Sequence, residues 1–222
     1  DANAADELQR CLWSLCEQTY PDWEALILAD TATKRRLKNK MPRKLRDNRI
    51  RWLVQQQTSL QETVQGDYTC LLSSFSQLES HALERYAVAA SQHDADIIYS
   101  DEAVLGGRPR RVIGLNLRPA FSYDYFLSSA FIGLFTALRT TLLPLEQQIL
   151  SHQSCDAINE SLVLHALTRA RSVLHIPDIL HFRHRIAGDF SNKRLDPRSV
   201  ENHLKEIGFS AAAVSQASTP GI

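Results

Sequence analysis

The stretch YTCLLSSFSQLES, residues 68–80, raises the question of what chemistry this chain can do. Its apolar pair Leu71 and Leu72 is typical of the end of a buried strand, and the polar residues that follow should open into a cleft at that strand's tip. Residues 73–77 include no carboxylate, imidazole or ammonium group. Asp30 lies at the carboxyl end of another short apolar run, EALILA. The sequence therefore predicts a cleft at residues 73–77 that has few groups for acid–base or metal chemistry.

A strongly basic run extends over Lys34–Arg51. It holds ten of the 25 Lys and Arg residues, with Asp47 as its sole acid. Such a run could bind phosphate-rich partners, either an anionic membrane surface or nucleic acid. A solvated helix face is the competing interpretation, because Leu37, Met41 and Leu45 recur at helical spacing and would form its buried side. We favour the solvated face, then peripheral membrane contact, and nucleic acid last.

Composition is ordinary for a globular domain. The 222 residues are 44% hydrophobic and 23% charged, with 25 basic and 25 acidic side chains, so net charge names no partner. The four cysteines form no C-x-x-C pair and lie in apolar patterns, which predicts reduced thiols without disulfides or zinc. The sequence has no run of about 18 apolar residues. We expect a cytoplasmic protein, with the inner face of the cell membrane as a further location.

Short apolar strands alternate with amphipathic helices along the chain. Helices are expected around residues 8–16, 34–45, 80–93, 162–170 and 200–207, and strands around residues 24–29, 50–54, 68–72, 94–102 and 172–177. This alternation predicts an α/β layered domain with a largely parallel sheet.

Five stretches carry a resemblance to a known family. They are LQRCLWSLCEQTYPDWEALILAD, HALERYAVAASQHDADIIYSDEAVLGGR, RPAFSYDYFLSSAFIG, LHIPDILHFRHR and VENHLKEIGFSAAAV. Together, and in this order, they resemble the family 2 glycosyltransferases, and most of all the rhamnosyltransferase-like branch that makes bacterial surface polysaccharides. The resemblance covers nearly the whole chain. It implies a GT-A fold, which is a Rossmann-like α/β fold with a mostly parallel central sheet flanked by helices.

The resemblance also implies a domain organisation. Residues 1–222 would form one GT-A-like domain, with a nucleotide-binding-like half at 1–102 and an acceptor-like half at 103–222. The chain begins on a helix-like stretch, where the family has an earlier first strand, and it closes on STPGI, which resembles a link to a second glycosyltransferase domain. We therefore expect a domain excised from a longer polypeptide, with that second domain as its partner.

The family's catalytic acids are substituted. Members hold Mn²⁺ or Mg²⁺ with an Asp-x-Asp pair, because a cation neutralises the charge that grows on the leaving phosphate. The matching residues here are Ser73, which offers one neutral oxygen to a nucleotide, and Phe75, which offers none. The family's general base matches Asn159, an amide that cannot accept a proton near neutral pH, and the adjacent Glu160 points about 100° away. Leu134 replaces a polar ring.

Other positions keep remnants of a donor site. Asp30 in ADTA matches the family's nucleobase contact. In HFRHR, either His181 or His184 matches a metal-completing histidine, while Arg183 and Arg185 are suited to contact a diphosphate. The resemblance thus makes Asp30, Ser73 and Arg183 candidate nucleotide-binding residues.

Local structure offers another explanation for several of these residues. Ser76 with Glu79 fits a capping box, and Ser80 is a second candidate to begin the next helix. Asn159 would cap its own helix, and Asp101–Glu102 would form a turn after a strand.

We therefore predict a degenerate glycosyltransferase-like domain of O-antigen-type or capsule-type biosynthesis, with a structural, glycan-binding or partner-binding role. Its alternative is an active metal-independent glycosyltransferase in which Arg183 and Arg185 stabilise the leaving phosphate. No cofactor is expected unless the site is active, when Mn²⁺ or Mg²⁺ would be needed. A weaker alternative is a module that binds anionic lipid or nucleic acid through Lys34–Arg51.

Overall fold

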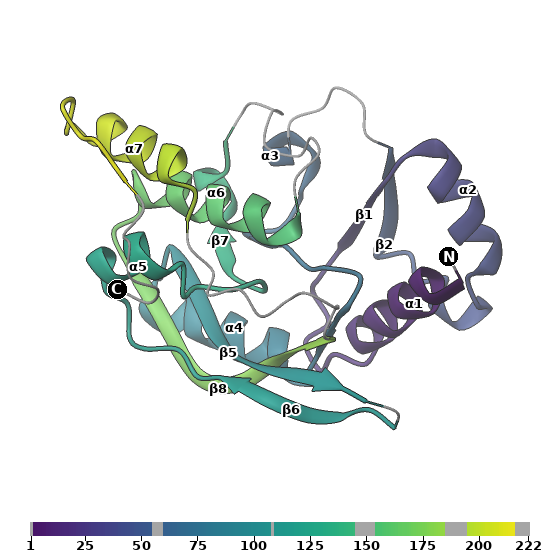
Figure 1. Cartoon of the computed structure of the whole chain (residues 1–222). Helices are drawn as coiled ribbons and strands as arrows, with labels where there is room; N and C mark the ends of the chain where they lie inside the picture. The colour runs from purple at the N-terminus through teal and green to yellow at the C-terminus, as the bar shows by residue number, and fades with distance from the viewer. Residues whose placement is uncertain (1, 55–59, 108, 145–153, 185–194, 216–222) are drawn as a thin grey trace.

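The computed structural model describes residues 2–54, 60–107, 109–144, 154–184 and 195–215 (Figure 1). Its helices are α1 (Ala2–Cys16), α2 (Thr31–Lys40), α3 (Leu60–Thr63), α4 (Ala82–His93), α5 (Tyr123–Ser129), α6 (Cys155–Leu167) and α7 (Pro197–Glu206), with 3₁₀ turns η1 (Arg43–Leu45) and η2 (Thr140–Leu142). Its strands are β1 (Ala25–Ala29), β2 (Ile50–Val54), β3 (Tyr68–Cys70), β4 (Ser76–Leu78), β5 (Ile97–Gly106), β6 (Arg111–Asn116), β7 (Ala137–Arg139) and β8 (Val173–His184). The expected helices and strands are present, but β5 and β8 run further than predicted, and α6 begins seven residues before the predicted helical face at 162–170.

The central sheet is curled and mixed. Its strands lie in the order β3-β7-β5-β8-β4, and β6 pairs with β5, while β1 and β2 form a separate parallel pair. Within the six-stranded sheet, β5 and β8 are parallel, but β7, β6 and β4 are antiparallel to their neighbours. The α/β fold is confirmed, and the expectation of a mostly parallel sheet is wrong. One reason is that β6 returns along β5 through a short hairpin, a connection that only antiparallel strands allow.

The ladder between β5 and β8 is irregular in its middle. Ser100 pairs with Ile176, Asp101 with Ile179 and Glu102 with His181, so extra residues of β8 are inserted on either side of Asp101. Such bulges redirect side chains locally. As a result, Glu102 and His181 lie side by side.

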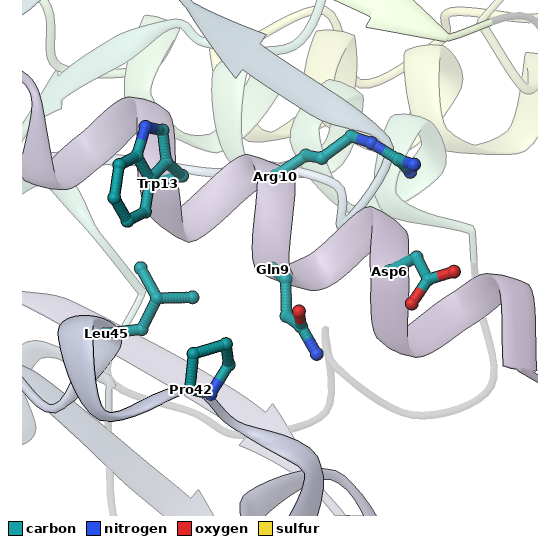
Figure 2. Close-up of a pocket in the computed structure, with 6 residues that line it drawn as sticks. All are labelled: Asp6, Gln9, Arg10, Trp13, Pro42 and Leu45. Atoms are coloured by element: carbon teal, nitrogen blue, oxygen red, sulfur yellow. The ribbon is translucent and has the colours of Figure 1, made fainter.

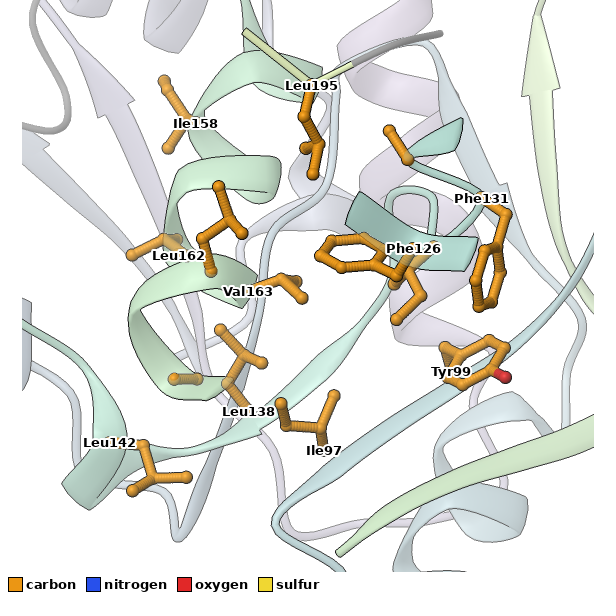
Figure 3. Packing of buried hydrophobic residues seen from close by; sticks show 14 of the residues in the cluster. Ile97, Tyr99, Phe126, Phe131, Leu138, Leu142, Ile158, Leu162, Val163 and Leu195 are labelled. Carbon is orange, nitrogen blue, oxygen red and sulfur yellow. The ribbon is translucent and has the colours of Figure 1, made fainter. Parts of the chain in front are cut away.

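Two clusters of buried apolar side chains cover opposite faces of the sheet. One joins Ile97 of β5 to Phe126 of α5 and Leu162 of α6 (Figure 3). The other joins Ile98 to Tyr86 of α4 and to the apolar stripe of α1. Because successive strand residues point to opposite faces, the neighbours Ile97 and Ile98 belong to different clusters. The middle of the sheet is therefore buried on both sides.

The helix in the basic run is shorter than predicted. α2 ends at Lys40, and Pro42 follows after one residue. The residue before a proline is disfavoured in the helical conformation, so the helix cannot continue through Met41. Of the three apolar residues expected to form one buried face, only Leu45 is buried, while Leu37 and Met41 remain partly exposed.

Two further observations concern the chain as a whole. Among the described helices, none combines the length and the apolar character needed to cross a bilayer. The predicted division of the domain at residue 102 falls inside β5, so the two halves share one continuous strand.

Candidate functional site

Glu102, in the middle of β5, is the centre of a buried ionic network. Its side chain is 2% exposed, and Oε2 lies 3.0 Å from Nδ1 of His181 on β8. Oε1 accepts a hydrogen bond of 2.7 Å from Nδ2 of Asn116. The same oxygen lies 3.6 Å from Nε of Arg183 and 3.8 Å from Nη2 of Arg118. One carboxylate therefore faces two guanidinium groups and an imidazole.

The network keeps Glu102 ionised. Burial by itself would raise the pKa of this carboxyl, but the close contact with His181 and the positive charges of Arg118 and Arg183 outweigh burial and hold the pKa well below its usual range. Burial lowers the pKa of Arg118, and the charge of Glu102 opposes that effect. The negative charge of the carboxylate and the positive charges of the two guanidinium groups thus offset one another inside the protein.

The prediction that Asp101–Glu102 form a turn is wrong. Both acids are buried within β5. Oδ1 of Asp101 accepts a hydrogen bond of 2.8 Å from the backbone N–H of Arg118 and lies 2.9 Å from Nε2 of His175. Because neighbouring segments supply these polar partners, the strand can continue through two acidic residues.

The serine-rich segment after β3 turns back into the sheet and does not open a helix. The backbone N–H of Ser76 donates to the carbonyl of Ser73 at 3.0 Å, and the chain from Ser76 then forms β4 along β8. The hydroxyl of Ser76, in a side chain that is 1% exposed, lies 2.9 Å from Nε2 of His181. The capping predictions for Ser76 and Ser80 are therefore wrong, because β8 provides partners for Ser76 and α4 begins after His81.

The groups at the predicted metal position do not fit a divalent cation. Oγ of Ser73 accepts a hydrogen bond of 3.2 Å from the backbone N–H of Phe75, whose side chain has no ligand atom. Both ring nitrogens of His181 are engaged, by Glu102 and Ser76. In the parts of the chain that the structure describes, no three His, Cys, Asp or Glu side chains gather as a metal-binding group. Mn²⁺ and Mg²⁺ prefer several carboxylate oxygens, and this set lacks them.

His184, the other metal candidate, belongs to a different set of contacts. Its Nε2 lies 2.8 Å from Oε1 of Gln77 and 3.2 Å from Nη1 of Arg110, which also pairs with Glu7 of α1. Burial and the charge of Arg110 lower the pKa of His184. Arg185 lies outside the described residues, so its predicted contact with a diphosphate stays a prediction.

Asn159 is buried in α6 and does not cap the helix, so its capping prediction is wrong. The cap is Ser154, whose side chain accepts a hydrogen bond from the backbone N–H of Ala157. Asn159 is 2% exposed, and its Nδ2 donates to the carbonyl of Gly133 at 2.9 Å. Leu134 is also buried, at 6% exposure. The residue that the resemblance matches to the family's base thus holds a neighbouring loop.

Asp156 is an acid that the sequence analysis missed. It lies in the first turn of α6, and its two carboxylate oxygens are 3.2 and 3.4 Å from Nη1 of Arg183. Its side chain is 27% exposed, far more than that of Glu102. The spacing contained a signal, because Asp156 precedes Asn159 by three residues, and residues three apart share a helix face.

Arg118 was missed as well. An added Cβ on Gly133 would lie 2.3 Å from Nη2 of Arg118, so the guanidinium packs directly against the glycine backbone. The Gly133 carbonyl accepts hydrogen bonds from Asn159 and from Thr136. Gly133 therefore connects the Glu102 network to α6.

Asp30 makes a local set of bonds. It is exposed, it caps α2, and its two oxygens accept hydrogen bonds of 2.8 and 2.7 Å from the backbone N–H and the hydroxyl of Thr33, which lower its pKa. No described hydrogen bond or ion pair joins Asp30 to the Glu102 network. The nucleotide-binding roles of Asp30, Ser73 and Arg183 stay predictions.

The fold is that of the GT-A glycosyltransferases. A crystal structure of Staphylococcus aureus TarS residues 1–349 in complex with UDP-GlcNAc superposes with a TM-score of 0.62 at 14% sequence identity, covering 97% of this chain and 65% of that chain. The same TarS fragment in complex with UDP superposes with a TM-score of 0.58 at 13% identity, covering 97% of this chain and 64% of that one. The predicted fold class is confirmed.

At the level of sequence, no family model matches the chain. The O-antigen biosynthesis protein RfbC of Myxococcus xanthus is 27% identical over 230 residues, which cover 95% of this chain and 18% of RfbC. The chain therefore spans less than a fifth of that relative and just under two thirds of the TarS fragment. These similarities confirm the resemblance to family 2 glycosyltransferases of surface-polysaccharide biosynthesis.

Proposed function

We propose that this domain is a glycosyltransferase family 2-like module of bacterial surface-polysaccharide biosynthesis, of O-antigen or capsule type, and that its own donor site is degenerate. The similarity to RfbC supports the biosynthetic class, and the similarity to TarS supports descent from a nucleotide-sugar enzyme. In this role the domain packs against a catalytic glycosyltransferase domain of the same polypeptide, or binds a glycan, and transfers no sugar itself.

One observation carries the proposal: the charged groups around Glu102 and Arg183 bind one another. Arg183 lies 3.2 Å from Asp156 and 3.6 Å from Glu102, and Glu102 also holds His181. A donor site needs carboxylates that can ligate a cation and cations that can meet a diphosphate. Here each charge already has a partner of opposite sign, and Ser73 contributes only a neutral oxygen to this end of the sheet.

Calorimetric titration with UDP, GDP and dTDP, each with and without Mn²⁺, tests the degenerate site. We expect no binding tighter than about 1 mM by the folded domain. The informative variant is Ser73→Asp with Phe75→Asp, which restores the acids, and its matched control is Ser73→Asn with Phe75→Asn. Mn²⁺-dependent binding gained by the aspartate variant and not by the asparagine control supports a lost metal site. Micromolar, Mn²⁺-dependent binding by the unmodified domain contradicts the proposal.

A second candidate function is a metal-independent glycosyltransferase, and the pair of Asp156 with Arg183 favours it. This acid lies one helical turn before the family's base position and is partly exposed, so it could accept a proton while the guanidinium meets phosphate oxygens. Metal-independent hydrolysis of a nucleotide-sugar, lost in Asp156→Asn and in Arg183→Gln but kept in Asp178→Asn, would establish this activity. Asp178 is a suitable control because it forms a partly exposed ion pair with Arg85.

A further inference from the structure

The basic run divides into two parts that differ in their contacts. Its last two cations are paired, Arg49 with Asp47 at 2.7 Å and Arg51 with Glu24. The stretch from Thr31 to Arg46 has no acidic residue. It carries the eight basic residues that we call the basic surface: Lys34, Arg35, Arg36, Lys38, Lys40, Arg43, Lys44 and Arg46.

The cations of the basic surface are not paired with acidic residues of the described chain. None of its eight cations forms an ion pair with a carboxylate of the described residues. α2 has no buried residue, so this helix packs only loosely against the rest of the domain. Because the whole chain has a net charge of zero, the remainder carries an excess of acid, and the positive charge is concentrated at this end.

An exposed indole adjoins these cations. Trp13 of α1 is 41% exposed, and Nζ of Lys44 lies 5.9 Å from the centroid of its ring. Figure 2 shows Trp13 facing Leu45 and Pro42 between α1 and η1. These three side chains line the apolar part of an open hollow of about 260 Å³, and Asp6, Gln9 and Arg10, on the same helix as Trp13, line its polar part.

We propose that the basic surface docks on an anionic phospholipid membrane, with Trp13 entering the headgroup region. Lys and Arg side chains are drawn to the negative potential of anionic lipid, and Trp is enriched where headgroups meet acyl chains. The exposed indole of Trp13 favours lipid over nucleic acid, since a polyanionic backbone alone offers no apolar region to receive it. This surface lies apart from the Glu102 network, so the inference does not depend on the proposed function.

Vesicle flotation with the 222-residue chain tests the proposal. The probes are vesicles of phosphatidylcholine alone and vesicles that also contain phosphatidylglycerol, at low and at high salt. The test variant changes Lys34, Arg35, Arg36 and Lys38 to Gln. Its control removes the same charge from exposed positions elsewhere, by changing Arg111, Arg169, Arg171 and Arg198 to Gln. Circular dichroism verifies that both variants fold.

We expect binding to the phosphatidylglycerol vesicles only, weakened about tenfold or more in the test variant and by high salt, and little changed in the control variant. Vesicles should also shift the tryptophan emission to the blue, and Trp13→Phe should remove that shift. Absence of binding, equal binding to neutral vesicles, or equal weakening in both variants would overturn the proposal. Tighter binding to a duplex DNA oligonucleotide than to the anionic vesicles at the same salt would also overturn it.

Discussion

Replacing Glu102 by Gln should destabilise the domain strongly. The change removes the negative charge that faces Arg118 and Arg183 but keeps the shape of the side chain and an oxygen for Asn116. Breaking a buried ion network by removing one partner costs about 3–5 kcal/mol, because the remaining charges stay buried. Arg183 keeps its contact with Asp156, so we expect the lower end, about 3 kcal/mol. For a domain of this size that corresponds to a melting temperature lower by about 6–12 °C.

Urea unfolding followed by circular dichroism measures this loss in the free energy of unfolding. The matched control is Glu201→Gln, which removes a partly exposed carboxylate paired with Lys205 and should change stability little. The folded-state pKa of Glu102 lies below its ordinary value of 4.5, so its stabilisation is complete above that pH and is lost as the pH falls toward the folded-state pKa. The difference between wild type and Glu102→Gln should therefore narrow in acid. A loss under about 1 kcal/mol at neutral pH would refute the reasoning.

Three further changes have expected outcomes. Gly133→Ala places a methyl group 2.3 Å from Nη2 of Arg118 and should lower the free energy of unfolding by about 1–3 kcal/mol; unchanged stability in urea would mean that Arg118 moves freely. Asn159→Asp removes the donor to the Gly133 carbonyl and should cost about 1–3 kcal/mol without creating nucleotide-sugar hydrolysis; a stable, active variant would contradict the assigned contact. Burial lowers the pKa of His203 from its ordinary 6.5, so its neutral form stabilises the fold above that pH and the stabilisation is lost below it. The melting temperature should therefore fall between about pH 7.5 and about pH 5.5, and His203→Gln should reduce the fall; an equal fall in both proteins would exclude His203 as a cause.

The sequence predicts those elements whose pattern is local. Several elements appear near their expected positions: the amphipathic helices α1, α4 and α6, and the short apolar strands β1 and β2. Each of these depends on a period of two or 3.6 residues that can be read within one segment. The helix of the basic run was overextended because the effect of Pro42 outweighs the apolar spacing around it.

The buried polar residues could not be predicted in the same way. The sequence predicts that Glu102 lies at the end of a strand, since burying an unpaired acid inside a sheet costs free energy. Its partners, Asn116, Arg118, His181 and Arg183, come from two segments further along the chain. His181 and Arg183 reach Glu102 because the β5–β8 register shifts beside it, and Asn116 pairs with Glu102 across the β5–β6 ladder; no single segment reveals either pairing. Helical spacing alone could have predicted that Asp156 shares a helix face with Asn159, but the family resemblance pointed only to Asn159.

The separation of β1 and β2 from the six-stranded sheet has a consequence for hydrogen exchange. This unit is a two-stranded sheet, every residue of β1 is partly exposed, and α2 beside it contributes no buried side chain (Figure 1). Its amides should therefore open and exchange well before those of β5 and β8, whose middle is covered on both faces. Asp30 and the part of the basic surface on α2 both belong to this easily opened unit. A nucleotide held by Asp30, or a membrane held by α2, would slow exchange there and leave the central strands unchanged, so deuterium uptake reports directly on which end of the domain a partner engages.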